Sequence, residues 1–208
     1  DPSGQALTND VIEAEVTTSD SDGDAVAVGY EWYVNGTAVG QSTSSLDGAT
    51  FFSKGDVVAV EVTPTDGQDE GVSITSSSVD VVNSAPTAPI VEIAPDRVVA
   101  GDHDLECVIQ TNAEDDDGDA LSYQFSWTVD GADAQTSSSV IDKSLIAAGE
   151  EWTCSVVAND GTSDGAIGSA TRVVASWPDN WVTSYYEDFS DGLAQDFEQY
   201  DSGCGGQS

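Results

Sequence analysis

An internal repeat constrains the fold of this chain more than any other feature of its sequence. The acidic string Asp20-Ser21-Asp22-Gly23-Asp24 returns 95 positions later as Asp115-Asp116-Asp117-Gly118-Asp119. The signals that follow each string also return in the same order and at nearly the same spacing. A chain of 208 residues that repeats itself in this way is expected to hold two copies of one small structural unit.

The residues after each acidic string read as short strands joined by tight turns. Alternating apolar and polar residues lead to a Trp in each copy, and a turn pair and a late Asp-Gly follow. These paired signals are Trp32 and Trp127, Asn35-Gly36 and Asp130-Gly131, and Asp66-Gly67 and Asp160-Gly161. Asn-Gly and Asp-Gly between strands are strong hairpin signals, and no segment shows helical periodicity of useful length. The pattern predicts an all-β fold of two tandem sandwiches, followed by an aromatic-rich C-terminal tail.

Changes of composition along the chain predict where its parts begin and end. We expect a first sandwich over residues 1–82, a Pro-rich linker over 83–89, a second sandwich over 90–175 and a tail over 176–208. In the first sandwich we expect strands over 50–52 and 57–62, and one unbroken last strand over 72–82. The tail reads as the start of a further domain or as an assembly segment.

The charge of the chain excludes several classes of partner. It carries 39 Asp and Glu against 4 Lys and Arg, a formal net charge of −35. Nucleic acids and anionic membrane surfaces attract basic proteins, so neither is an expected partner. The sequence also lacks the run of about 20 apolar residues that membrane insertion by a helix needs. The acidity indicates adaptation to a salty environment, binding of cations, or both.

The acidic strings, the Trp-ending strands, the late Asp-Gly pairs and the Pro-rich linker together resemble a known group. Over residues 8–175 the chain is similar to the tandem immunoglobulin-like repeats of bacterial secreted and surface proteins, relatives of cadherin-like and PKD-like repeats. This resemblance implies two tandem immunoglobulin-like β-sandwiches, calcium as cofactor and a secreted or cell-surface location. The further acidic linker motifs of cadherins are missing, so cadherin-type adhesion is not implied.

An immunoglobulin-like fold would bring distant acidic residues together. Its B–C and F–G loops lie at the same end, so the acidic string and the late Asp of each copy would converge on one calcium ion, which favours carboxylate and carbonyl ligands. The predicted ligands are Asp20, Asp22, Asp24 and Asp66 in the first copy and Asp115, Asp117, Asp119 and Asp160 in the second. We expect the second site to face the linker. The alternative is that Asp and Gly are simply good loop residues.

Two of the three cysteines also fit the immunoglobulin-like pattern. Cys107 and Cys154 flank Trp127 in the order Cys, Trp, Cys, which predicts a disulfide between the two sheets. Their counterparts in the first copy are Ile12 and Val60. A disulfide indicates an oxidising, extracytoplasmic setting. The alternative is a pair of buried free thiols.

The tail holds the remaining candidate contact residues. These are Trp177, Trp181, Tyr185, Tyr186, Phe189 and Cys204. They could form a carbohydrate-stacking surface, the edge of a third domain, or a strand that inserts into a neighbouring subunit. The single histidine, His103, leaves a hydrolytic triad or zinc site without its parts.

We therefore expect a non-enzymatic, extracellular, structural or adhesive repeat protein. Calcium would stabilise it as a rigid spacer or surface-fibre subunit. Its expected partners are other copies of itself, neighbouring repeats of the same protein, or a carbohydrate. The alternative function is an accessory module of a larger secreted enzyme or carbohydrate-binding protein.

Overall fold

The computed structural model describes residues 4–21 and 23–175. Asp22 and the predicted tail contacts, from Trp177 to Cys204, lie outside these described residues. The chain divides into two compact units. Unit 1 comprises Asp1–Val91, Ile109–Phe125 and Ser155–Ser169, and unit 2 comprises Glu92–Val108, Ser126–Cys154 and Ala170–Ser208. Among the described residues no helix is long and apolar enough to cross a membrane.

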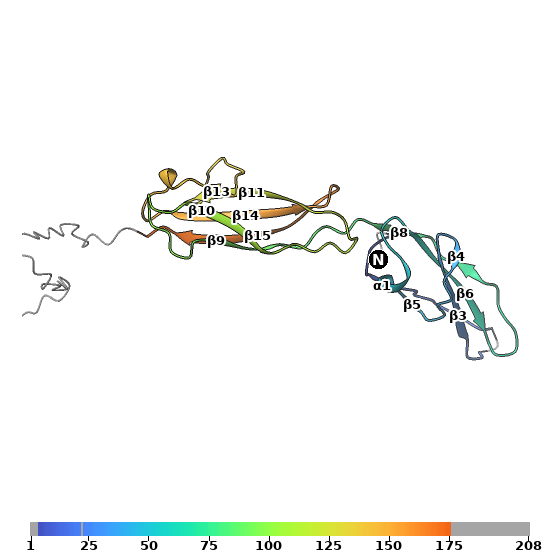
Figure 1. Cartoon of the computed structure of the whole chain (residues 1–208). Coiled ribbons are helices and arrows are strands. Elements are labelled where there is room, and N and C mark those ends of the chain that lie inside the picture. Colours follow the sequence, from blue (N-terminus) through green and yellow to red (C-terminus); the bar gives the residue numbers. More distant parts are fainter. Residues whose placement is uncertain (1–3, 22, 176–208) are drawn as a thin grey trace, which may run out of the picture. The chain divides into compact units, whose positions relative to one another are not determined.

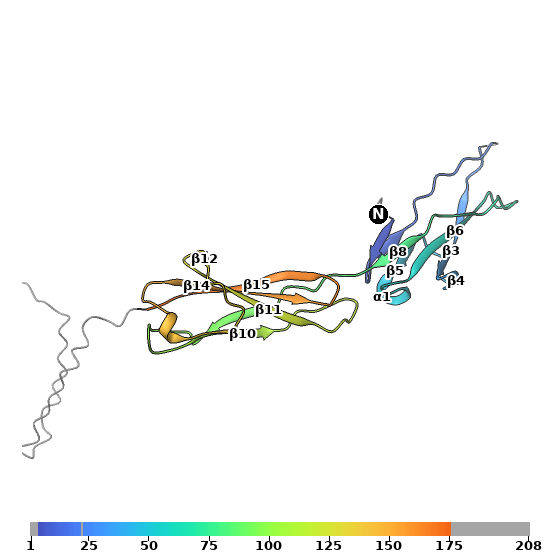
Figure 2. The same ribbon diagram turned by 90° about the horizontal axis from the view of Figure 1, so that it is seen from above.

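The first repeat forms two β-sheets of unequal size. Its elements are β1 (Gln5–Leu7), β2 (Val11–Glu13), β3 (Ala27–Val34), β4 (Thr37–Ala38), β5 (Ser45–Asp47), α1 (Gly48–Phe51), β6 (Val57–Thr65), β7 (Ile74–Thr75) and β8 (Val79–Val82). The larger sheet has the order β1-β8-β6-β3-β4, with β7 also on β6, and the smaller sheet holds β2 and β5. Strands β3, β6 and β8 lie side by side in Figure 1 and again in Figure 2.

The long hairpin partners β3 and β6 carry the core of the first repeat. They pair antiparallel from Ala27 opposite Thr65 to Val34 opposite Val58. Trp32 is 1% exposed and packs in one cluster with buried aliphatic and aromatic side chains from both sheets, Leu46, Phe52, Val58, Val60 and Val81. The indole N–H of Trp32 donates to the carbonyl of Thr43 at 2.9 Å, so this buried polar atom is satisfied.

The second repeat follows the same plan, with one more strand in its smaller sheet. Its elements are β9 (Ile90–Ala94), β10 (Leu105–Thr111), β11 (Ser122–Val129), β12 (Ala132–Asp133), β13 (Val140–Ile141), the 3-10 helix η1 (Lys143–Leu145), β14 (Glu151–Asn159) and β15 (Asp164–Val173). One sheet has the order β13-β10-β9 and the other β12-β11-β14-β15. The predicted fold class, two tandem immunoglobulin-like sandwiches, is confirmed for the described residues.

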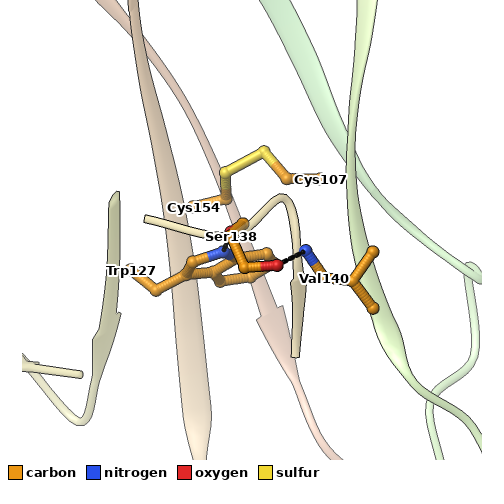
Figure 3. The surroundings of a disulfide bond; sticks show 5 residues. All are labelled: Cys107, Trp127, Ser138, Val140 and Cys154. Atoms are coloured by element: carbon orange, nitrogen blue, oxygen red, sulfur yellow. Dashed lines mark hydrogen bonds between the residues drawn. A yellow bond between two sulfur atoms is a disulfide. The ribbon is translucent and has the colours of Figure 1, made fainter. Parts of the chain in front are cut away.

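The predicted disulfide is present and joins the two sheets of the second repeat. Cys107 on β10 and Cys154 on β14 are bonded, with their Cα atoms 6.1 Å apart. Figure 3 shows the bridge beside the indole of Trp127, whose N–H donates to the carbonyl of Ser138 at 2.8 Å. Trp127 therefore repeats the part that Trp32 plays in the first repeat. There the positions of the two cysteines hold Ile12, which is half-buried, and Val60, which is buried.

Two expected strands differ from the structure. In place of the strand expected at 50–52, residues 50–51 end α1 and Phe52 is its C-cap, because the Asp47 side chain accepts from the Ala49 N–H and caps a helical turn. The last strand expected over 72–82 is broken into β7 and β8. There the Ser76 N–H still donates to the Val60 carbonyl at 2.8 Å, but the Val60 N–H donates to the Ser76 hydroxyl and not to a backbone carbonyl, which interrupts the regular ladder.

The residues expected as a linker pack closely on the second repeat. The Pro86 carbonyl accepts from the Ala166 N–H at 3.2 Å, and the Thr87 N–H donates to the Glu114 carbonyl at 2.8 Å. A Cβ atom at Gly165 or Gly168 would overlap the backbone of this segment, so glycine is required for its close approach to β15. The segment thereby brings Asn83 and Ser84 to the acidic loops of the second repeat.

Candidate metal site

The acidic string of the second repeat forms a loop between β10 and β11 that is held by its own first carboxylate. Asp115 Oδ1 accepts from the backbone N–H groups of Asp117 at 3.0 Å and Asp119 at 3.1 Å. Gly118 has a φ of 75°, a left-handed conformation that favours glycine. One carboxylate oxygen from each of Asp115, Asp117 and Asp119 lies within 4.8 Å of the other two. The loop thus gathers three of the predicted ligands.

The spacing and chemistry of this cluster suit calcium. Ca²⁺ binds oxygen at about 2.3–2.6 Å, so two oxygens on one ion lie at most about 5 Å apart. Asp115 Oδ2 is buried and has no hydrogen-bond partner. A buried carboxylate oxygen without a partner is costly, and a cation beside it would remove that cost. The residues present therefore fit a hard divalent cation.

Residues from the linker and the first repeat cover the middle carboxylate of the cluster. The side chain of Asp117 is 1% exposed. Its Oδ2 accepts from the Ser84 N–H at 2.7 Å, and its Oδ1 accepts from the Thr8 hydroxyl. These contacts all fall within unit 1. The loop therefore meets the segments that precede it in the chain, as the sequence predicted for the linker.

A lysine lies at the edge of the carboxylate cluster. Lys54 Nζ forms an ion pair with Asp119, lies 4.0 Å from Asp117 and donates to Asn83 Oδ1 at 3.0 Å. The hydrogen bond to Asp119 is the main cause that raises the pKa of Lys54, so its ammonium stays charged. One positive charge offsets only part of the negative charge of Asp115, Asp117, Asp119 and Asp160.

The fourth predicted ligand, Asp160, lies outside the group of three but is linked to it. Its Oδ1 accepts from the N–H groups of Thr162 at 2.6 Å and Ser163 at 2.7 Å, and its Oδ2 accepts from Asn83 Nδ2 at 2.8 Å. These bonds, the one from Asn83 first, hold the pKa of Asp160 well below its usual range. Asn83 thus connects Asp160 on one side to Lys54 on the other.

The first copy builds the same two turns, with Asp22 outside the described residues. Asp20 Oδ1 accepts from the Gly23 and Asp24 N–H groups at 2.9 and 3.1 Å. Asp66 Oδ1 accepts from the Asp69 and Gln68 N–H groups at 2.8 and 2.7 Å, and these bonds lower its pKa. Asp20 and Asp66 line one cavity of about 210 Å³. Within residues 4–21 and 23–175, however, only the Asp115 group has three acidic ligand atoms close together.

Sequence reasoning did not assign Thr8, Lys54, Asn83 or Ser84 to this site. None of them belongs to the acidic pattern, and each reaches the cluster only through the tertiary fold. The sequence could have indicated Asn83 and Ser84, because they are the first two residues of the predicted linker, which was expected to face the second metal site.

Comparisons with known proteins find distant structural likenesses. No family model and no curated protein matches the chain. One similar solved structure is the chicken interferon gamma receptor alpha chain, with 10% identity, a TM-score of 0.47, and 82% of this chain and 95% of that chain covered. The fibronectin(III)-like modules of Clostridium thermocellum CbhA have 18% identity and a TM-score of 0.29, with 83% of this chain and 89% of that chain covered. Three N-terminal domains of the bacteriophage RB49 Highly Immunogenic Outer Capsid protein have 17% identity and a TM-score of 0.33, with 83% of this chain and 56% of that chain covered. Likenesses this distant carry no argument about ligand, partner or role.

Proposed function

We propose that this chain is a non-enzymatic structural module of a secreted or cell-surface protein, and that Asp115, Asp117 and Asp119 bind a calcium ion that stiffens the start of the second repeat. The observation that carries this proposal is the buried, unpartnered Oδ2 of Asp115 within a group of three carboxylates. Carboxylates this close repel one another unless a cation lies among them. Lys54 supplies only one such charge, and it does so at Asp119.

Calcium at this place would act on the join between the repeats. Asp117 accepts from Ser84 in the linker and from Thr8 in the first repeat, and Asp119 pairs with Lys54. An ion that fixes the positions of these carboxylates would also fix the groups that bind them. The effect on the chain is therefore expected to be mechanical, as suits a spacer, and no group in the cluster needs to react.

The setting outside the cytoplasm rests on the disulfide. Cys107–Cys154 closes the core of the second repeat, and such bonds persist in oxidising compartments. Millimolar calcium is typical of extracellular calcium-binding modules, whose sites need only modest affinity.

Thermal unfolding of the full chain tests the proposal. Melts in calcium and in chelator, at matched ionic strength, should differ, because an ion that binds only the folded state adds about 2.7 kcal/mol when present at 100 times its Kd. Asp117→Asn should remove most of this shift, because it removes a charged ligand while keeping an oxygen that can accept from Ser84. Asp24→Asn, in the exposed first loop, is the matched control and should keep the shift. An unchanged wild-type melt would contradict calcium binding.

A further inference from the structure

One lysine of the first repeat reaches the carboxylate cluster of the second repeat. Lys54 Nζ forms an ion pair with Asp119 and lies 4.0 Å from Asp117 Oδ2. Within the described ranges 4–21 and 23–175, no other Lys, Arg or His forms an ion pair with the carboxylates of the cluster. An ammonium therefore already takes part of the place that the proposed calcium ion would fill.

The turn that carries Lys54 does not need a lysine. In each repeat a glycine with a left-handed φ, 89° at Gly55 and 87° at Gly149, donates its N–H to the carbonyl of a valine, at 2.8 and 2.9 Å. The residue before Gly149 is Ala148, so the counterpart of Lys54 carries no charge. The turn therefore does not explain the ammonium of Lys54, whose contacts all lie at the acidic loops.

The backbone of Lys54 is fixed next to the loop that its side chain binds. Its N–H donates to the Thr8 hydroxyl oxygen at 3.0 Å, and the Thr8 hydroxyl in turn donates to Asp117. The side chain of Lys54 is nevertheless 33% exposed. Partly exposed ion pairs contribute little net free energy, so a divalent cation can displace this ammonium from Asp119.

The ammonium has a second acceptor outside the group of three carboxylates. Lys54 Nζ donates to Asn83 Oδ1 at 3.0 Å, and Asn83 Nδ2 donates to Asp160 Oδ2 at 2.8 Å. If an ion took the carboxylate of Asp119, Lys54 would keep its hydrogen bond to Asn83 and stay near the negative charge of Asp160. Its own charge would therefore not be left unpaired when the loop binds an ion.

We propose that Lys54 is a built-in competitor for the metal site. Without calcium, its ammonium pairs with Asp119 and offsets part of the repulsion within the cluster. When calcium binds, Asp119 passes to the ion and the ammonium remains on Asn83. This inference rests on the proposed function, because it describes how calcium binding at that same site is regulated. It implies that the loop is held to the first repeat even when calcium is scarce.

Replacement of the ammonium by calcium makes one substitution act with opposite signs. Lys54→Met keeps an aliphatic side chain and removes the charge. Without calcium the loop of the variant should be held less firmly, because close carboxylates repel one another and less of that repulsion is offset. With calcium the loop of the variant should gain more, because no ammonium has to leave Asp119. A lysine that only supported the site would instead weaken both states.

The amide of Ser84 reports the state of the loop directly. Its N–H donates to Asp117 Oδ2 at 2.7 Å, so its hydrogen exchange becomes faster when the loop opens. The test measures this rate by NMR on the full chain. In chelator it should be about two- to fivefold higher in Lys54→Met than in the wild type, as expected for the loss of a partly exposed ion pair.

Three controls make the measurement specific to this ion pair. The Val39 N–H, which is hydrogen-bonded in the core of the first repeat, is the internal reference and should exchange equally in all chains. Lys143→Met removes a lysine that contacts a different part of the second repeat and should leave Ser84 exchange unchanged. In an Asp119→Asn background Lys54→Met should have little effect, because the ion pair is already lost.

Adding calcium separates this inference from the proposed function. At saturating calcium the Ser84 N–H should exchange slowly in both chains, and the slowing relative to chelator should be larger in Lys54→Met. Slowing by the same factor in both chains would overturn the replacement at Asp119 and leave calcium binding standing. No slowing in either chain would overturn the proposed function itself. Equal Ser84 rates of the two chains in chelator would overturn the role of Lys54 as a counter-ion.

Discussion

The two acidic loops of this protein have almost the same local structure and different surroundings. Asp20 and Asp115 each accept two N–H groups of their own loop, and Asp66 and Asp160 each accept two N–H groups of their own turn. In the second repeat, Ser84, Asn83 and Lys54 bind the carboxylates as well. Asp20 and Asp24 in the first repeat are exposed.

The two acidic strings build similar turns and differ in the segments that cover their described carboxylates. The string determines the turn, because Asp and Gly at these positions satisfy the loop backbone. Burial of the carboxylates comes from the segments that cover them, and a buried oxygen without a partner is costly. The proposed calcium ion would remove that cost. The comparison predicts that the same substitution at matching core positions should lower the stability of the two repeats equally. The same substitution at matching positions of the acidic loops should have different effects on stability and calcium binding.

The largest expected change in the free energy of unfolding tests whether the cores of the two repeats are equally stabilised by their Trp residues. Trp32→Ala and Trp127→Ala should each lower the free energy of unfolding of their own repeat by about 3–5 kcal/mol, because each removes a buried indole and its hydrogen bond. Denaturant unfolding measures both. A much smaller cost in one repeat would show that its Trp is not a core residue of the same kind.

The next effect tests the disulfide, which only the second repeat has. Cys107→Ile with Cys154→Val gives the second repeat the residue types of the first. Losing the bond should cost about 2–5 kcal/mol, because its 47-residue separation restricts the unfolded chain. Denaturant unfolding with and without reductant gives the same comparison for the wild type. Insensitivity of the wild type to reductant would contradict a stabilising role.

A smaller effect tests the part that Lys54 plays in the second loop. Because its ammonium pairs with Asp119, it competes with any ion bound there. Lys54→Met should therefore tighten calcium binding by about two- to fivefold, as expected for the loss of a partly exposed ion pair. Calorimetric titration measures the affinity. The matched control is Lys143→Met, because Lys143 lies away from the acidic loops, and weaker binding after Lys54→Met would argue that Lys54 supports the site.

The smallest predicted effect is a fall of the melting temperature as the pH is lowered. The pKa of Asp160 is lower in the folded chain than its unfolded value of about 3.9, so its contribution is fully present above that pH and is lost as pH falls through the folded pKa. Asp160→Asn should lower the melting temperature at neutral pH and flatten its fall in acid. Asp66→Asn should change the melting temperature less, because among the described residues no side chain donates to Asp66 as Asn83 donates to Asp160. Melts in chelator measure this, and an unchanged acid limb in Asp160→Asn would contradict it.

Much of the fold could be predicted from local pattern, and part of the site could not. Alternation before Trp32 and Trp127, and the turn pairs after them, indicate the strands because these signals act between neighbouring residues. The strand predicted over 50–52 was wrong, because the Asp47 cap favours a helical turn where the apolar residues alone favour a strand. Lys54 and Asn83 could not be placed from pattern because they reach Asp119 and Asp160 only through the assembled fold. The calcium ligands themselves stay predictions.

The most direct test of the account is a count of calcium ions per chain by equilibrium dialysis, with wild type and loop variants. The account predicts one bound ion per chain at saturating calcium, lost in Asp115→Asn and Asp117→Asn and kept in Asp20→Asn and Asp66→Asn. Absence of bound calcium would contradict the proposed site. Two equal ions, one lost with each loop, would contradict the proposal that burial of the carboxylates by neighbouring segments, and not the acidic string alone, makes the site.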